Sequence, residues 1–136
     1  MSASWALQQA IFATLCSGDD VKDVAGDPAR VFDAPPRGED FPYIVIGDDT
    51  QSDWSTATEP GSEHAVAVHV WSRAGGHREA KLVAEAVRGA LDGAELSVTG
   101  QALIDLRHLE TEFFRDGDGE TFRAVLRFRA VMEESE

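Results

Sequence analysis

The sequence predicts an α+β protein in which two helices pack on one face of a mainly antiparallel sheet. Three observations support this prediction. Apolar residues recur at helical spacing in two separate segments. Other segments alternate between apolar and polar residues or are apolar throughout, as strands do. The C-terminal third has the pattern of a long hairpin around a glycine-rich turn. The 136 residues suit one domain, 1–136, which is large enough to bury a core without disulfides or a metal.

The first helix is expected over residues 4–16, which Ser4 can cap and Gly18 can end. Apolar side chains recur there every three to four residues and form a stripe. The stripe comprises Leu7, Ile11 and Leu15, widened by Trp5 and Phe12. This segment therefore predicts a helix that turns one apolar face toward a core.

The next segments lead into the sheet. Residues 19–29 are acidic and rich in turn formers, with room for one short helical turn, and residues 30–32 fit a short strand. The proline-rich residues 33–42 predict a loop. Residues 43–47 are apolar throughout, which is typical of a strand covered on both faces. The polar residues 48–62 predict a long loop or the tip of an extended hairpin.

The middle of the chain predicts a central strand and a second helix. Over residues 63–72 a row of valines points one way, and a row of alanine, histidine and tryptophan points the other, so both faces are largely apolar. Gly75 and Gly76 interrupt this strand. A helix is expected over residues 77–91, where apolar residues recur at helical spacing and Gly93 can end it.

The closing segment is expected to form a short strand, a long hairpin and a tail. The predicted ranges are 94–98 for the short strand, 102–114 and 121–132 for the hairpin, and 133–136 for a frayed tail. A turn that places residue 115 opposite residue 120 fixes the register of the hairpin. The pairs expected from it are Phe113 with Phe122, Leu109 with Leu126, and Glu112 with Arg123.

Composition and charge exclude several classes of function. The chain has 12 Lys and Arg against 25 Asp and Glu, which gives a net charge of −13, and residues 1–63 hold 3 basic and 12 acidic residues. Such a chain lacks the basic surface that DNA, RNA or an anionic membrane requires. The single cysteine, Cys16, excludes an internal disulfide. No apolar run approaches the roughly 20 residues of a membrane span, and no basic residue precedes Lys22, so we expect neither a membrane anchor nor export.

Metal and catalytic motifs are weak. Asp116, Asp118 and Glu120 resemble the start of a calcium loop, but the sixth and twelfth positions lack the required Gly and Glu, and a hairpin turn is the better interpretation. His64 and His69 lie five residues apart on a strand and so project to opposite faces. The sequence therefore predicts no catalytic residue, no cofactor site and no metal site.

The acidic segment 48–62 holds four candidate interface residues: Asp48, Asp49, Asp53 and Trp54. Clustered carboxylates could hold a metal or act as an acid–base pair, although a solvated acidic loop is far commoner. A tryptophan in a polar loop is either folded onto its own core or available to a partner. We expect this loop to be mobile in the free subunit and to become ordered in an assembly, with Trp54 as the anchor.

A row of arginines forms the second set of interface candidates. Arg123, Arg127 and Arg129 are separated by even numbers of residues, so they share one face of the last strand. Two interpretations stay open: they pair with carboxylates of a neighbouring molecule, or they pair within the chain, for example Arg123 with Glu112.

Four short segments carry a resemblance to a known family: FPYIVIGDD at 41–49, DWST at 53–56, GSEH at 61–64 and VHVWSR at 68–73. In their order and spacing they resemble the tail-completion or tail-terminator proteins of tailed bacteriophages and gene transfer agents. The first helix, the strand before the prolines, the second helix and the closing hairpin also fit, so the resemblance covers nearly the whole chain.

The resemblance implies a structural virion protein without enzymatic activity, assembled in the bacterial cytoplasm and located in the tail. It implies a hexameric ring on the last ring of tail-tube protein, which stops tube polymerisation and presents a surface to the head connector, or stopper. The negative charge suggests that DNA passes the lumen without specific binding. Two alternatives remain: another connector or tube protein of the same particle, and a small carboxylate-based metal-binding domain.

Overall fold

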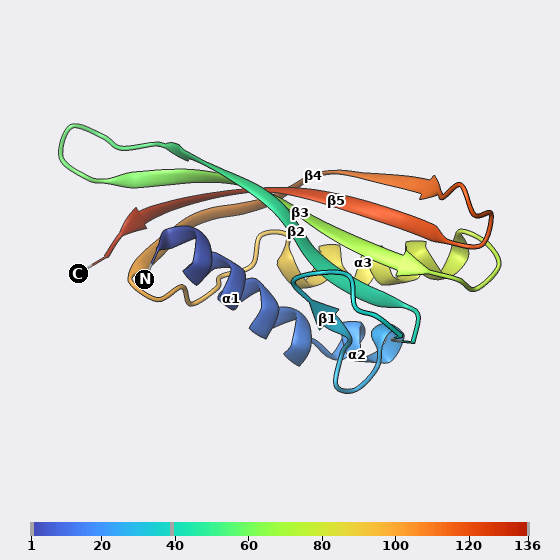
Figure 1. Cartoon of the computed structure of the whole chain (residues 1–136). Coiled ribbons are helices and arrows are strands. Elements are labelled where there is room, and N and C mark those ends of the chain that lie inside the picture. The colour runs from blue at the N-terminus through green and yellow to red at the C-terminus, as the bar shows by residue number, and fades with distance from the viewer. Residues whose placement is uncertain (1, 39, 136) are drawn as a thin grey trace.

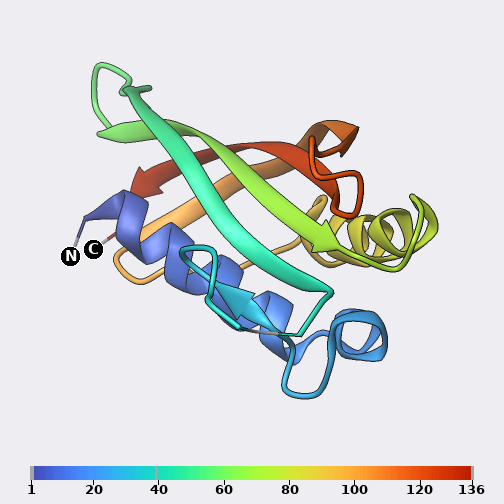
Figure 2. The same ribbon diagram turned by 45° about the vertical axis from the view of Figure 1, so that its right-hand side comes forward.

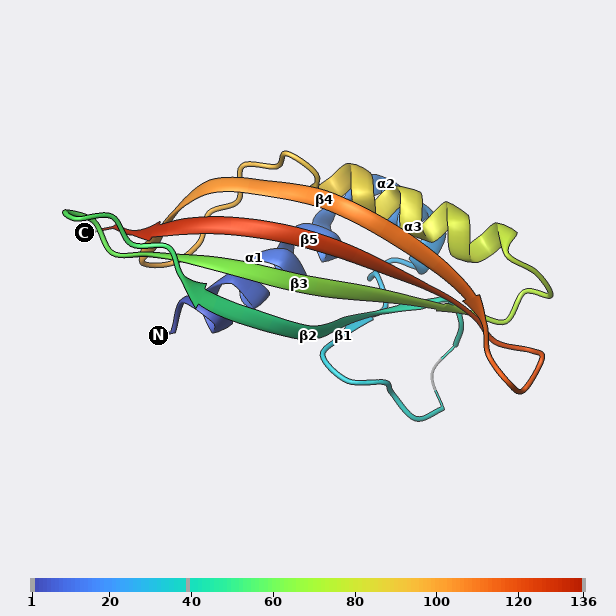
Figure 3. The ribbon, with the colours of Figure 1, turned by 90° about the horizontal axis from the view of Figure 1, so that it is seen from above.

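The computed structural model describes residues 2–38 and 40–135. Within these residues, three helices lie on one side of a five-stranded sheet, and no helix lies on the other side (Figures 1 and 3). The helices are α1 (Ala3–Ser17), α2 (Asp19–Ala25) and α3 (Arg78–Leu91). The strands are β1 (Val31–Phe32), β2 (Tyr43–Asp53), β3 (Gly61–Ser72), β4 (Gln101–Arg115) and β5 (Phe122–Glu134). The predicted α+β class with helices on one face is confirmed, with three helices instead of two.

The additional helix, α2, arises in the segment where only a single turn was expected. Val21 and Ala25 are both fully buried and lie one helical turn apart, so they present one apolar face. Asp19 and Asp20 occupy the first turn, where acidic side chains interact favourably with the helix dipole. Packing against α3 stabilises a helix of this length, which would be marginal alone.

The sheet has the strand order β1-β2-β3-β5-β4, so β3 is its central strand as predicted. All pairs are antiparallel except β1 with β2, which is parallel. Even-numbered residues of β3, such as Val68 and Val70, point into the core, and odd-numbered residues such as His69 and Trp71 lie on the face without helices. We call this second surface the open face.

One hydrophobic core lies between the helices and the sheet. Each element contributes the residues that its period places on the inner side. Its largest fully buried side chains include Leu7, Ile11 and Leu15 of α1, Leu91 of α3, Ile44 of β2, and Leu126 and Phe128 of β5. Figure 2 shows α1 running along this side of the sheet, with α2 and α3 at its far end.

Of the two alternatives for residues 48–62, the extended hairpin is the one observed and the long loop is wrong, because most of the segment is strand. β2 continues to Asp53 and β3 begins at Gly61, so only residues 54–60 lie outside the two strands. Beyond a bulge between Ile46 and Asp49, Thr50 pairs with Ala65 and Asp53 with Ser62. The residues from Asp48 to Asp53 are exposed and polar, so they show no alternation of apolar and polar side chains that would indicate a strand. The backbone pairing with β3 holds them in the sheet, and the local pattern could not reveal that pairing.

The closing hairpin has the expected strands in a different register. Arg115 pairs with Phe122, two residues away from the predicted arrangement, and Phe113 therefore lies opposite Ala124. Leu109 lies at a bulge between His108 and Glu110, so its predicted pairing with Leu126 is wrong. The cause is a wider turn, because the carboxylate of Asp118 accepts hydrogen bonds from the backbone of Glu120 and Thr121.

The segments flanking this hairpin also differ from expectation. Residues 94–98 form no strand; only an isolated bridge joins Val98 to Gln101. The tail was expected to fray from residue 133, yet β5 reaches Glu134, whose backbone N–H donates to Pro60 at 3.1 Å. Residue 136 lies outside the described residues. The long β2–β3 hairpin supplies the partner that keeps the end of β5 ordered.

Candidate interaction surfaces

The open face is the first candidate surface, because none of the helices that the structure describes covers it (Figure 3). The predicted arginine row lies on it: the three arginines alternate along β5 with buried core residues. Their partners are within the chain. Arg129 pairs with Glu63, and Arg127 pairs with Glu110 at 3.3 Å and with Glu112 at 3.4 Å.

Arg123 has two aromatic neighbours in addition to one carboxylate. Its guanidinium carbon lies 5.1 Å from the ring of Trp71 and 5.1 Å from that of Phe114, and Asp116 is 3.8 Å from its Nε. The expected pair of Arg123 with Glu112 is wrong, because the register shift places Glu112 beside Arg127 instead. The shared face is confirmed, whereas contact with a neighbouring molecule stays a prediction.

The three acidic candidates of β2 are not brought together. Asp48 is exposed at the bulge and borders hollows of the open face. Asp49 pairs with Val66 and accepts a hydrogen bond from the hydroxyl of Ser4 on α1 at 2.7 Å. Asp53 lies at the far end of the strand, where it accepts a hydrogen bond from the Ser55 hydroxyl at 2.6 Å. Asp53 lies four positions after Asp49 along the strand, a distance of roughly 13 Å, so the two cannot act as one carboxylate pair.

The hairpin tip 54–60 is held by its own hydrogen bonds. The backbone N–H of Trp54 donates to Gly61 at 3.0 Å, and that of Thr56 donates to Glu59 at 2.9 Å. The hydrogen bonds from the hydroxyl and the backbone N–H of Ser55 to Asp53 lower the pKa of that carboxyl. Trp54 is 42% exposed and is not part of the core. Its role as an anchor for a partner stays a prediction.

The two strand histidines lie on opposite faces, as predicted from their spacing. His64 is fully buried on the core side, with its Nε2 2.8 Å from the hydroxyl of Ser62. Burial lowers the pKa of His64. His69 lies on the open face beside Gly47, and burial together with the nearby Arg123 lowers its pKa.

The described residues were compared with two kinds of site, a cluster of metal-ligating side chains and a membrane-spanning helix. Within 2–38 and 40–135, no three His, Cys, Asp or Glu side chains lie together as metal ligands would. Among the helices that the structure describes, none is long and apolar enough to cross a bilayer.

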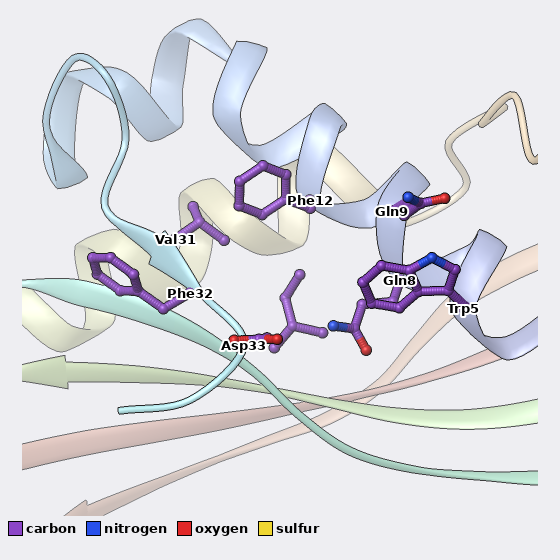
Figure 4. Close-up of a pocket in the computed structure, with 8 residues that line it drawn as sticks. Trp5, Gln8, Gln9, Phe12, Val31, Phe32 and Asp33 are labelled. Carbon is purple, nitrogen blue, oxygen red and sulfur yellow. The ribbon is translucent and has the colours of Figure 1, made fainter. Parts of the chain in front are cut away.

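One surface was missed by the sequence interpretation. Trp5 and Phe12 were assigned to the core stripe of the first helix, but they are 48% and 44% exposed. They border a hollow of about 540 Å³ between α1 and β1, which Val31 and Phe32 also line (Figure 4). The signal that could have found it is the absence of any charged residue in α1, because an uncharged exposed helix face is unusual. We call this surface the α1 groove.

These features define a class of protein: a small α+β subunit with an uncovered sheet face and an exposed apolar groove, suited to assembly with other subunits. Residues 9–133 match the family described as "Tail completion protein gp17", and the chain belongs to this family. It is 27% identical over 129 residues to the tail completion protein gp17 of Bacillus phage SPP1, covering 93% of this chain and 92% of that protein.

A solved structure shares the whole fold. A chain of the virion of a native gene transfer agent particle superposes with a TM-score of 0.89 at 31% identity, covering 97% of this chain and 98% of that one. A second solved chain, at 15% identity and a TM-score of 0.50, shows the fold alone. The predicted family is confirmed, and the protein is a structural component of the tail of a phage or gene transfer agent particle.

Proposed function

We propose that this protein caps the head-proximal end of the tail tube, ends tube polymerisation and joins the tail to the head connector. In this proposal it acts as a ring of identical copies, a homohexamer, between tube protein and stopper. The observation that supports it is the match to a chain of a gene transfer agent virion, which covers 97% of this chain and 98% of that one at a TM-score of 0.89.

The physical features fit such a role. A ring needs two different contact surfaces on each subunit, and the chain exposes the α1 groove on one side and apolar residues of β4 on the other. The net charge of −13 would repel DNA phosphates, so a genome could pass a lumen made of this protein without binding to it.

The alternative within the same particle is another connector or a tube protein. Deleting the gene in a producing strain and imaging the particles distinguishes the three roles. A terminator predicts overlong tubes and tailless heads, restored by the intact gene. Loss of a tube protein would abolish tubes altogether. Loss of a connector would leave tails of normal length detached from heads, and either of these results would overturn the proposal.

A further inference from the structure

Most of β2 forms an open edge of the sheet. β1 pairs only with Ile44 and Val45, whereas β2 continues to Asp53 with β3 on its other side. Figure 3 shows β2 and β4 along opposite borders of the sheet. An open strand edge presents backbone N–H and C=O groups, so it can accept an extended segment as a further strand. We call residues 49–53 the β2 edge.

The pairing with β3 shows which backbone groups of this edge face outward. The backbone N–H of Trp54 donates to Gly61, which makes the preceding residue, Asp53, one whose own backbone groups point away from β3. Such residues alternate along an antiparallel ladder, so Gln51 and Asp49 are placed in the same way. In the described part of the chain, no hydrogen bond reaches these outward groups. They are left to water or to an added strand.

The side chains along this edge are acidic and have no basic partner within the described chain. Asp48, Asp49 and Asp53 are exposed, and none of the ion pairs among the described residues includes them. Helix α1, whose Ser4 bonds to Asp49, has no charged residue. Opposite charges on neighbouring strands attract each other, so this edge favours a strand that carries lysine or arginine.

The same charges argue against a second copy of this chain as the added strand. Two β2 edges would bring aspartates together, and like charges on neighbouring strands are destabilising. The opposite edge, β4, carries three acidic residues against two basic ones, and its Arg107 is already paired with Asp105 at 3.6 Å. The aspartates therefore disfavour pairing between copies and favour a basic strand from a different protein.

We propose that the β2 edge binds an extended, basic segment of another protein of the particle as an added strand. In this contact the backbone of the segment bonds to Asp49, Gln51 and Asp53, and its basic side chains pair with the aspartates of the edge. The hydrogen-bonded tip 54–60 orders the hairpin beforehand, which lowers the entropy cost of binding. The inference deepens the proposed function by naming a kind of partner, and it rests on that function only in requiring an assembled particle.

A peptide array tests the contact and identifies the segment. Short overlapping peptides that cover every protein of the particle, this chain included, are probed with the tagged subunit. The proposal predicts that peptides of positive net charge from another protein bind, and that their binding weakens as the salt concentration rises. Signals confined to peptides from this chain, or no binding to any peptide, would overturn it.

Proline on the edge separates strand addition from contact through side chains. Gln51→Pro removes an outward N–H without breaking a bond to β3, so the subunit should fold while peptide binding falls roughly tenfold or more. Thr111→Pro is the matched control, because Thr111 has the same outward placement on β4 and its variant should bind normally. Thermal melting checks both folds. Unchanged binding by Gln51→Pro, or a larger loss for Thr111→Pro, would contradict the proposal.

Two further measurements decide the question even if the proline variant does not fold. A triple variant, Asp48→Asn with Asp49→Asn and Asp53→Asn, removes the charges and keeps an oxygen acceptor at each position. It should weaken binding of the basic peptide roughly tenfold. In the complex with that peptide, the outward amides of the β2 edge should exchange hydrogen more slowly than in the free subunit. Unchanged exchange there, or unchanged binding by the triple variant, would overturn the added strand.

The failure of this inference is distinguishable from failure of the proposed function. Overlong tubes in the deletion strain, with full complementation by folded Gln51→Pro, would keep the terminator role and overturn the contact. Tails of normal length in the deletion strain, with peptide binding that Gln51→Pro abolishes, would keep the contact and overturn the role.

Discussion

At the scale of single residues, the structure shows side chains whose surroundings differ from what their type suggests. His64 is a titratable group on the core side of β3, fully buried, with Ser62 as its hydrogen-bond partner. Gly47 is a position where any side chain would meet the ring of His69. Both positions lead to direct tests by substitution.

Burial of His64 predicts a pH-dependent stability. Its pKa is lowered in the folded state, so as the pH falls below about 6.5 the unfolded chain binds the proton first. The stabilising contribution is complete above that pH and is lost progressively toward the lower folded-state pKa. We expect His64→Gln to flatten the decline in unfolding free energy between about pH 7 and pH 5, measured by urea denaturation. His108→Gln is the control, and an equal flattening there would contradict the assignment.

Two glycine substitutions should act in opposite directions. An alanine Cβ at Gly47 would lie 2.6 Å from Nε2 of His69, so we expect Gly47→Ala to cost about 1–3 kcal/mol. Gly89 lies inside α3 with open space around it, so Gly89→Ala should stabilise by about 0.5–1 kcal/mol. Chemical denaturation measures both. Equal effects at the two sites would show that the packing of His69 does not constrain β2.

At the scale of elements, the β2–β3 hairpin and the β4–β5 hairpin reach beyond the helices (Figures 1 and 3). Both hairpins end in turns ordered by an aspartate. The bonds from Thr121 and Glu120 lower the pKa of Asp118 to about 2, and Asp53 holds Ser55 in the other turn. Polar turns with internal hydrogen bonds position the projecting residues without help from the core.

Trp54 is a large hydrophobic side chain in one of these turns and is 42% exposed, and its substitution tests the anchor hypothesis. We expect Trp54→Ala to change the unfolding free energy of the monomer by less than about 1 kcal/mol, because Trp54 lies outside the core. In particles it should leave tails uncapped and overlong. Trp71→Ala is the matched control: Trp71 stacks on Tyr43 and Arg123, so its loss should cost more than about 2 kcal/mol. A comparable loss of unfolding free energy for Trp54→Ala would show that Trp54 stabilises its own subunit and is not an anchor for a partner.

At the scale of the whole molecule, one face of the sheet builds the core, and the other carries arginines paired with glutamates. Because these pairs are largely at the surface, they contribute little to stability, and several can be rearranged without unfolding the chain. We expect them to matter more in assembly, where the charges of two surfaces decide whether they attract or repel each other.

A charge swap separates the two roles of the arginine row. Arg129→Glu removes the pair with Glu63 and places two acidic groups together, so it should lower both melting temperature and particle yield. Adding Glu63→Arg restores an ion pair within the chain. If Arg129 also contacts a neighbour, we expect the double variant to melt normally and still give few complete particles. Recovery of the particle yield would mean that Arg129 acts only within its own chain.

The sequence alone determined those features that depend on spacing along the chain. The spacing in α3 and β3 identified which side chains face the core, and that in α1 identified Leu7, Ile11 and Leu15. Even spacing placed Arg123, Arg127 and Arg129 on one face. Order and spacing of four short segments were enough to indicate the family. These inferences succeed because, in a helix or a strand, the separation of two residues along the chain determines whether their side chains point to the same face.

Only the tertiary structure decided which segments meet. Pairing with β3 extended β2 through polar residues, and a turn centred on Asp118 shifted the closing hairpin by two residues. In the tertiary structure Trp5 and Phe12 line a groove, although their spacing fits the apolar stripe that faces the core equally well. The physical reason is that these features depend on contacts between residues far apart in the chain. The spacing of apolar residues within one segment cannot show which strand it pairs with, in which register, or which face of a helix is covered.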